Sequence, residues 1–233
     1  MYRYETHLHT FPVSKCAKAT VREQLNFYRN EGFDGVFITN HFLDGNVNVD
    51  KTLPYARQLE FYLSDYFEAK KLEEEMGLSV FFGVELSQQR TDFLVYGLDP
   101  DWYRRHPEVA VMEKSDLLPY LMEAGALVIH AHPFRVGKGI KVLRLYPWAV
   151  HGAEVFNACR TDHENEMAAL FVKHYDLIPF AGSDIHAPAR MTNLGGMETD
   201  SPLIDEKDFV RRVLEKTAVP FSCPVKHREE QPL

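Results

Sequence analysis

The sequence predicts an α/β fold in which short strands alternate with amphipathic helices. Short apolar runs recur along the chain and are separated by segments with helical periodicity, which is the pattern of repeated β/α units. Each predicted strand ends where a polar or ionisable residue begins. The length of 233 residues suits one domain of this kind, because α/β barrels extend to about 250 residues as a single unit.

The first predicted strand and helix have clear boundary residues. The strand covers residues 2–9. The helix covers residues 20–32, because Thr20 is a suitable N-cap with Glu23 three residues later, and Gly32 ends the helical pattern. The next elements, in chain order, are a strand over 35–39 that delivers Asn40 and His41, a densely charged helix over 55–76 that closes at Gly77, and a strand over 78–84 that delivers Glu85.

The second half of the chain continues the alternation. In chain order its elements are a strand over 92–96, a helix over 116–123 ended by Gly125, strands over 126–129 and 153–156, a helix over 162–173, a strand over 178–181, a helix over 206–216 and a strand over 218–221. We expect residues 1–222 to form a single domain. Residues 223–233 are rich in charge and proline and are expected to form a loose C-terminal tail.

The composition argues against several classes of protein. With 26 basic and 34 acidic residues the formal charge is −8, which disfavours binding to long nucleic acids. No apolar run is long enough for a membrane span, and the N-terminus lacks a signal-peptide pattern. Three scattered cysteines are too few for a disulfide framework. We therefore expect a cytoplasmic protein without a membrane partner.

Ionisable residues gather at the ends of the predicted strands. The pair His7 and His9 is a weak signal alone, although alternate residues of a strand share a face and can hold one ion. A barrel builds its site at the carboxyl ends of its parallel strands, so the residues there would meet in one mouth. These residues are His7, His9, His41, Glu85, His132, Asp184 and His186. Imidazole and carboxylate ligands without a CxxC pair suit zinc, manganese or iron.

Six short motifs occur in an order that resembles a known superfamily. They are His-Leu-His-Thr, Ile-Thr-Asn-His-Phe, Gly-Val-Glu-Leu, Ala-His-Pro-Phe-Arg, Ala-Glu-Val-Phe-Asn and Gly-Ser-Asp-Ile-His, and they span residues 7–186. In this order they resemble the successive motifs of the PHP (polymerase and histidinol phosphatase) superfamily. The resemblance implies a distorted, TIM-like (β/α)7 barrel with two or three divalent metal ions at its carboxyl-terminal mouth. It also implies hydrolysis of phosphate esters.

The resemblance assigns the candidate ligands residue by residue. They fall into three groups, which are His7, His9, Glu85 and Asp184 for the first ion, Glu85 and His132 for the second, and His41 and His186 for the third. Glu85 would bridge the first two ions. His130 matches no ligand position of the family, so we expect it to lie behind the ligands rather than bind metal.

The chain departs from the family pattern at three positions. Cys16 stands where many members place a histidine of the third ion, and it is either a thiolate ligand or a buried neutral thiol. Asp92 stands where the second ion usually has another histidine, and it is either an oxygen ligand or a solvated turn residue. Asn40 replaces the usual aspartate before His41. The number of ions, two or three, therefore depends on these positions.

The predicted chemistry follows from these charges. A water between two divalent ions about 3.5 to 4 Å apart loses its proton near neutral pH and can attack phosphorus. We therefore predict a metal-dependent phosphoesterase that uses a metal-bridged hydroxide on a small phosphorylated molecule, most simply a phosphomonoester. Arg135 and Arg190 are candidate donors to the phosphate, unless either is a solvated surface residue. His186 or His41 would protonate the leaving group if the third ion is absent.

Three alternatives remain open from the sequence. An amidohydrolase barrel also opens with a His-x-His strand and closes with a metal-binding aspartate. It usually bridges its ions with a modified lysine or a glutamate, and this chain has no lysine at a matching strand end. A non-catalytic, metal-holding regulatory domain is the second alternative, although such relatives tend to have lost ligands. A nuclease or nucleotide phosphatase is the third, and the net charge disfavours only long polymers. Nothing in the sequence selects a substrate or an oligomeric state.

Overall fold

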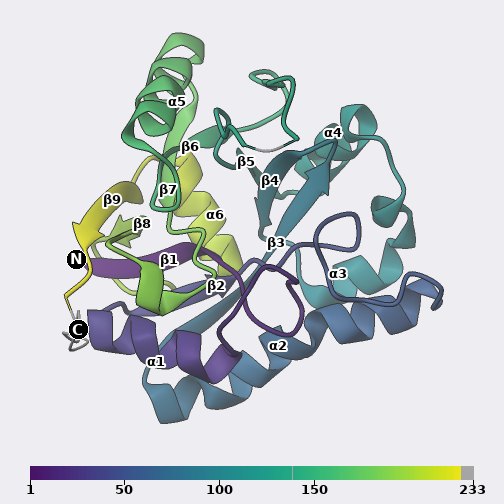
Figure 1. The fold of residues 1–233 in the computed structure, drawn as a ribbon, viewed down its shortest axis with the longest axis horizontal. Helices are drawn as coiled ribbons and strands as arrows, with labels where there is room; N and C mark the ends of the chain where they lie inside the picture. Colours follow the sequence, from purple (N-terminus) through teal and green to yellow (C-terminus); the bar gives the residue numbers. More distant parts are fainter. Residues whose placement is uncertain (138, 227–233) are drawn as a thin grey trace.

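The computed structural model, which describes residues 1–137 and 139–226, is an α/β fold built on one large sheet (Figure 1). In this part of the chain the sheet has nine strands in the order β7-β6-β5-β4-β3-β2-β1-β8-β9. The strands are β1 (Tyr2–Leu8), β2 (Gly35–Ile38), β3 (Ser79–Gln88), β4 (Thr91–Tyr96), β5 (Leu127–His130), β6 (Gly152–Asn157), β7 (Ile178–Gly182), β8 (Asn193–Thr199) and β9 (Val219–Pro224). The helices are α1 (Val21–Glu31), α2 (Tyr55–Met76), α3 (Pro100–Arg105), α4 (Lys114–Glu123), α5 (Asp162–Tyr175) and α6 (Glu206–Leu214). The predicted α/β class is confirmed.

The sheet curls into a nearly closed barrel. β7 begins the hydrogen-bonded order, yet it also contacts β1, β8 and β9 at the other end of that order. An isolated bridge between Leu8 and Ile185 joins the chain segments that follow β1 and β7. The barrel shape therefore agrees loosely with the expected TIM-like architecture. The count of seven β/α units is not confirmed by the nine described strands and stays a prediction.

Two described strands, β4 and β8, run against the direction of the others, so the expectation of parallel strands is wrong for the predicted strand β4. β1, β2 and β3 are parallel neighbours, as are β5, β6 and β7. β4 is antiparallel to both β3 and β5, and β8 and β9 also run antiparallel to their neighbours. The link after β3 is so short that Gln88 pairs with Thr91 and the chain turns back at once. As a result β3 extends beyond its predicted end, Glu85 lies within it opposite Leu94, and β4 starts at the mouth of the barrel.

The strand β8 was not predicted, because two glycines interrupt its apolar pattern. Gly196 lies where a β-carbon would be 2.2 Å from the backbone oxygen of Tyr4 on the neighbouring strand β1. The close approach of the two backbones requires glycine here. The composition of β8 is therefore set by its packing against β1, which local sequence patterns do not report.

Helix boundaries follow the predicted capping signals. Thr20 caps α1 in a capping box with Glu23, whose carboxylate accepts the Thr20 backbone N–H at 2.7 Å. Gly32 ends this helix in the left-handed region at φ 81°, and Gly77 ends α2 at φ 59°. A residue with a β-carbon is strained in that region, so both glycines stop their helices where the sequence predicted.

Helix α6 fills one end of the barrel. The fully buried ring of Phe209 lies 4.4 Å from Phe37 and 5.3 Å from Tyr96, measured between ring centroids. Tyr96 ends the antiparallel strand β4, so it lies with the starts of the parallel strands, such as Leu127 on β5. Helix α6 thus closes the end where the parallel strands begin, and the opposite end carries the polar residues.

The C-terminal region continues the sheet beyond its predicted limit. β9 extends to Pro224, and the backbone N–H of Lys226 donates to Glu31 at 2.7 Å. The remainder of the predicted loose tail, residues 227–233, lies outside the described residues. Among the helices that the structure describes, none combines the length and apolarity needed to cross a membrane.

Candidate metal centre

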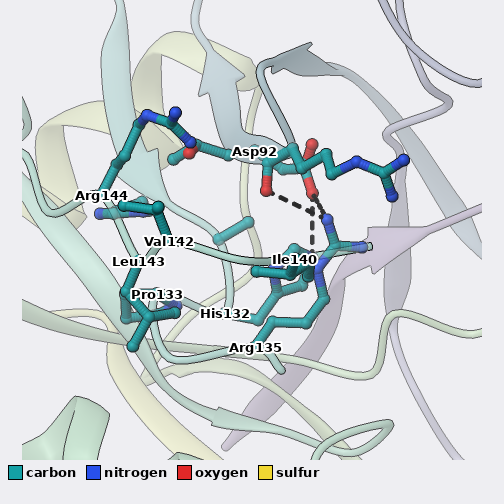
Figure 2. Close-up of a pocket in the computed structure, with 12 residues that line it drawn as sticks. Asp92, His132, Pro133, Arg135, Ile140, Val142, Leu143 and Arg144 are labelled. Carbon is teal, nitrogen blue, oxygen red and sulfur yellow. Dashed lines mark hydrogen bonds and ion pairs between the residues drawn. The ribbon is translucent and has the colours of Figure 1, made fainter. Parts of the chain in front are cut away.

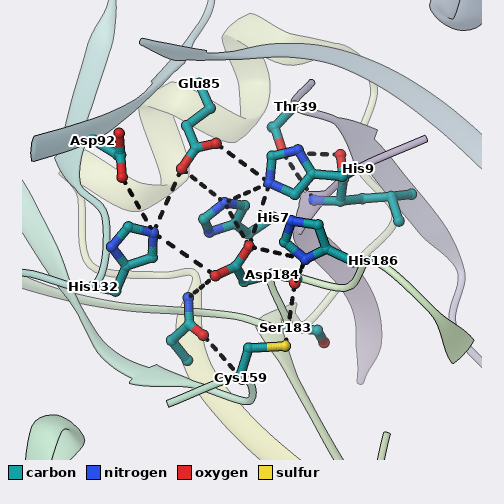
Figure 3. A network of polar contacts seen from close by, with 12 residues as sticks. His7, His9, Thr39, Glu85, Asp92, His132, Cys159, Ser183, Asp184 and His186 are labelled. Atoms are coloured by element: carbon teal, nitrogen blue, oxygen red, sulfur yellow. Dashed lines mark hydrogen bonds and ion pairs between the residues drawn. The ribbon is translucent and has the colours of Figure 1, made fainter. Parts of the chain in front are cut away.

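The predicted ligands meet at the open end of the barrel, and Figure 3 labels all of them except His41. His7 comes from β1, His41 follows β2, Glu85 lies on β3, His132 follows β5 and Asp184 follows β7. All these side chains are buried, together with His9 and Asp92, and His186 is partly buried. The structure therefore brings together every residue proposed as a ligand, while its role in metal binding stays a prediction.

The first group of ligands joins β1 to the segment after β7. The Nε2 atoms of His7 and His9 are 3.3 Å apart, and Asp184 Oδ1 lies 3.3 Å from His9 Nε2 and 3.6 Å from His7 Nε2. Donor atoms of these three residues lie close enough together to hold one ion. His7 and His9 face the same side because side chains alternate along a strand, and Leu8 between them points the other way into the apolar core.

Glu85 faces histidine nitrogens with both of its oxygens. Oε1 lies 3.2 Å from His7 Nε2 and 3.5 Å from His132 Nε2. Oε2 lies 3.3 Å from His9 Nε2 and 2.6 Å from His41 Nδ1. Both oxygens are buried and their nearest partners are imidazole nitrogens, so a cation held among these nitrogens would neutralise the buried carboxylate. This is the arrangement expected of a carboxylate that bridges two ions.

Glu154 orients His7, and the sequence motif that contains it did not reveal this role. Its Oε1 lies 2.9 Å from His7 Nδ1, and a carboxylate only accepts hydrogen bonds, so His7 carries its proton on Nδ1. The lone pair of Nε2 is then free for metal, as in other carboxylate–histidine–metal arrangements. The other oxygen, Oε2, accepts the backbone N–H of His132 at 2.8 Å and the side-chain amide of Asn157 at 2.9 Å.

Ser14 and Asn40 orient His9 in the same manner. The Ser14 hydroxyl donates to Asn40 Oδ1 at 2.8 Å, so its oxygen accepts from His9 Nδ1 at 3.2 Å and leaves His9 Nε2 free. Asn40 is buried and also accepts the backbone N–H of Thr10 at 2.7 Å. Asn40 therefore holds the segment of Thr10 and Ser14, which directly follows the ligand His9.

The ionisable groups of the cluster shift one another's pKa in opposite directions. Burial lowers the pKa of His7, but the carboxylates of Glu154, Asp184 and Glu85 raise it well above the usual value. Burial raises the pKa of Glu85, but the nearby His41, His7 and His9 hold it well below the usual value. The carboxylates therefore favour positive charge beside them. A divalent ion would supply that charge and displace the imidazole protons.

Asp92 and Arg135 form an ion pair at the rim of the cluster (Figure 2). Arg135 Nη2 lies 2.7 Å from Asp92 Oδ2, and the same oxygen lies 3.8 Å from His132 Nε2. Asp92 is only 3% exposed, so the alternative of a solvated turn residue is wrong. It reaches the cluster because β4 starts at the mouth of the barrel. Arg135 is partly exposed and points toward the same site that it was predicted to serve.

A basic cavity lies next to the pocket that Asp92, His132 and Arg135 line. Its volume is about 270 Å³, and it shares residues with the pocket beside Asp92 and His132. Its lining residues are Gln89, Arg90, Gly139, Ile140, Lys141, Val142 and Arg144. An anionic molecule bound at the cluster would therefore meet cationic side chains on this side.

Two other predicted residues have different surroundings. Arg190 is exposed and ends a short 3-10 helix over Pro188–Arg190, which begins two residues after His186. His130 is 1% exposed and stacks on Phe93 with ring centroids 5.0 Å apart. Burial, and then the charge of His132, lower the pKa of His130 to about 3. His130 is thus a neutral imidazole packed among aromatic rings, which agrees with its exclusion from the ligands.

Cys16 lies with a second set of histidines. Its sulfur belongs to a group with His9, His41 and His186 in which the donor atoms are all within 4.8 Å of one another. Burial raises the pKa of the Cys16 thiol, but hydrogen bonds with His186 and His41 more than offset this and lower the pKa to about 6. His186 donates from Nδ1 to the backbone oxygen of Asp184 at 2.7 Å, so Nε2 is the nitrogen that can bind a metal ion.

Two residues of the cluster have strained backbones. His132 has φ 28° and Asp184 has φ 54°, both in the left-handed region that residues with a β-carbon rarely adopt. Such conformations cost on the order of 1 to 3 kcal/mol and persist where surrounding contacts fix them. Here they turn two side chains into the cluster directly after β5 and β7.

Comparison with known proteins gives likenesses of fold. The sequence matches no protein-family model and no curated protein. A two-domain protein from Bacteroides vulgatus, described as containing a predicted PHP-like metal-dependent phosphoesterase, matches 94% of this chain with a TM-score of 0.69 and 13% identity. This chain spans 64% of the length of that structure. A putative metal-dependent phosphoesterase from Bifidobacterium adolescentis matches 91% of this chain and 96% of its own, with a TM-score of 0.55 and 17% identity.

A third structure belongs to a different class of hydrolase. It is an amidohydrolase from Chromobacterium violaceum with bound sulfate and no metal, and it matches 93% of this chain and 97% of its own with a TM-score of 0.53 and 15% identity. The first two structures confirm the predicted resemblance to PHP-like proteins at the level of the fold. At these identities the likeness concerns the fold, and the activity has to be argued from the site.

Proposed function

We propose that this protein is a metal-dependent hydrolase of phosphate esters, with a small-molecule phosphomonoester as its substrate. The observation that carries the proposal is the position of Glu85. Its two oxygens are buried and face separate sets of histidine nitrogens. A bridging carboxylate at the mouth of a barrel suits a pair of ions, and a pair of ions suits transfer of a phosphoryl group.

The residues present fit such a pair of ions. In His7, His9 and His186, Nδ1 donates a hydrogen bond to an oxygen, and Nε2 is left to bind metal. Imidazole and carboxylate donors suit zinc, manganese or iron. When bound, two such ions would lower the pKa of a water molecule and neutralise the charge that builds on phosphorus.

Side chains of this chain would position the substrate. Arg135 lies at the rim with a planar guanidinium, which can direct two N–H groups at phosphate oxygens. Its ion pair with Asp92 fixes the guanidinium beside His132. The basic cavity next to it, with Arg144 and Lys141, would favour an anionic molecule over a neutral one.

Departure of the alcohol requires a proton. If no third ion is bound, His41 and His186 are the candidates, because both lie beside the first group of ligands and stack on the His9 ring, with centroids 4.5 Å and 4.6 Å away. Burial lowers the pKa of His186, but hydrogen bonds with Cys159 and Cys16 and the charge of Asp184 raise it to about 10. In that state His186 is a proton donor.

The test is phosphate release from a broad panel of phosphomonoesters and phosphodiesters. Protein stripped with EDTA should be inactive, and manganese, zinc or iron should restore release of phosphate from at least one monoester. An Asp184→Asn variant should lose the activity and serve as a control for contaminating phosphatases. Metal-replete protein that turns over no phosphoester would refute the proposal.

An amidohydrolase activity is the second candidate, because a protein of that class shares the fold. Release of ammonia or ring opening from cyclic amides by metal-replete protein would favour it over phosphate release. A domain that binds metal without turnover in either assay would be the regulatory alternative. A cytoplasmic location and a small, non-polymeric substrate remain predictions from composition.

A further inference from the structure

We propose that Cys16 binds metal as a thiolate together with His41 and His186, which makes one position of the centre a zinc-type site for a thiophilic ion. The inference rests on the metal binding of the proposed function and is independent of the reaction catalysed. It concerns the position at which this chain places a sulfur atom among histidine nitrogens.

The loop that carries Cys16 is held in place by backbone hydrogen bonds to the two loops that carry the histidines. The N–H of Lys15 donates to the oxygen of Asn46 at 2.9 Å, on the loop after His41. The N–H of Lys18 donates to the oxygen of His186 itself at 2.7 Å. Backbone hydrogen bonds on both sides of Cys16 therefore hold its loop against the loops of His41 and His186.

The number of protein ligands follows from the direction of His9. Its Nε2 lies within 3.3 Å of Asp184, Glu85 and His7, so it serves the first group of ligands. One imidazole lone pair binds one ion. His9 instead contacts this second position with its ring faces, which stack on His41 and His186.

Cys16, His41 and His186 then remain as three protein ligands. Structural zinc sites use four protein ligands, whereas catalytic zinc sites use three and keep a position open. A ligand set of one sulfur and two nitrogens favours zinc, and in the laboratory cobalt or cadmium, over manganese or magnesium. The group therefore has the composition of an open, zinc-type site directly beside the carboxylate ligands.

Cys159 provides a matched control within the same chain. It is also partly buried and contacts the same loop, but its sulfur lies 3.2 Å from the backbone oxygen of Asp184 and 3.9 Å from Met191 Sδ. Its thiol also hydrogen-bonds with His186, but Cys159 does not belong to a group of potential ligands in the described part of the chain. The two cysteines thus differ in the property that the proposal invokes.

The experiment is titration of metal-free full-length protein with cobalt(II), followed by absorption spectroscopy. Wild-type protein and a Cys159→Ser variant should show a near-ultraviolet thiolate-to-cobalt charge-transfer band. Cys16→Ser should lose the band and one equivalent of bound zinc. Cys16→His should lose the band and keep the zinc, because an imidazole replaces the thiolate; this variant keeps the test valid if Cys16→Ser folds poorly.

Two results would overturn the inference. One is full cobalt binding by the wild-type protein without the charge-transfer band, and the other is a band that persists in Cys16→His. Failure of the proposed function has a different signature. A protein with the band but without phosphate release supports the thiolate site and refutes the phosphoesterase, and a protein with phosphate release but without the band does the reverse.

Discussion

Replacement of Glu154 by glutamine tests whether the carboxylate behind the ligands controls metal affinity. Glu154 is 1% exposed and accepts three hydrogen bonds, from His7 Nδ1 at 2.9 Å, from the His132 backbone N–H at 2.8 Å and from the Asn157 amide at 2.9 Å. Glutamine has nearly the same shape, but one of its two terminal atoms is a donor. The variant therefore changes hydrogen bonding with little change in volume.

Neither orientation of a glutamine side chain satisfies the three donors. If its oxygen faces His7, its NH2 group meets the N–H groups of His132 and Asn157. If its NH2 group faces His7, the imidazole must move its proton to Nε2, where the metal would bind. Loss of a hydrogen bond to a charged acceptor costs about 1.5 to 3 kcal/mol, and loss of such supporting partners weakens metal binding about 10- to 100-fold.

The assay is competition for zinc between the protein and a chromophoric chelator at neutral pH. Glu154→Gln should bind zinc about 10- to 100-fold more weakly than wild type. Glu166→Gln is the control, because Glu166 is exposed on α5 and loses the same charge elsewhere. Zinc affinity of Glu154→Gln equal to that of Glu166→Gln would refute the assignment of Glu154 as the residue that orients His7.

Three further predictions concern Glu85, Gly182 and His130. Glu85→Ala should lower the content of two bound ions together in metal analysis, because the Glu85 oxygens face two sets of histidines. The control Glu68→Ala, at an exposed position, should retain both ions. An undiminished metal content in Glu85→Ala would contradict the bridging role. Gly182→Ala would place a β-carbon 2.5 Å from His7 Cβ and 2.8 Å from Glu154 Oε1, so it should lower the free energy of unfolding by about 1 to 3 kcal/mol and weaken zinc binding. Gly137→Ala, whose β-carbon would meet open space, is the control, and equal unfolding midpoints in urea would count against the reasoning. Burial, and then the charge of His132, lower the pKa of His130 to about 3 in the fold, so its contribution to stability is complete above pH 6.5 and is lost as the pH falls from there toward 3. At pH 5 the loss is about 2 kcal/mol. His130→Phe should show a smaller drop in unfolding free energy between pH 7 and pH 5 than wild type, while exposed His163→Gln should match wild type; an unchanged drop in His130→Phe would show that His130 does not titrate on unfolding.

Local signals were sufficient for the elements and the ligands that depend on neighbouring residues. Helix α2 has its predicted bounds because Gly77 ends it in a left-handed conformation. His7 and Asp184 were identified because each lies at or after the end of an apolar strand. Such features are set within a few residues of the chain, so a sequence pattern reports them.

Features set by contacts between distant segments were missed. The antiparallel direction of β4 depends on its pairing with both β3 and β5, and this direction places Asp92 at the mouth of the barrel. The role of Glu154 depends on His7, which is 147 residues away in the chain. β8 tolerates its glycines because β1 packs closely against it. None of these contacts produces a periodic pattern of apolar residues from which it could be predicted.

The incomplete pairing of the sheet gives the metal ligands a mechanical role. β1 and β7 approach each other, but the sheet order runs from β7 through five other strands before it reaches β1. Where the two strands meet, the backbone contributes the N–H of His9 to the oxygen of Ile185 at 3.3 Å, and no ladder joins them among the described residues. An ion held by His7, His9 and Asp184 would cross-link β1 to the segment after β7, where the described part of the sheet has no strand pairing. Ion binding and completion of the barrel are then one thermodynamic event, so a chelator would loosen the fold along this line before it affects the helices on the outside.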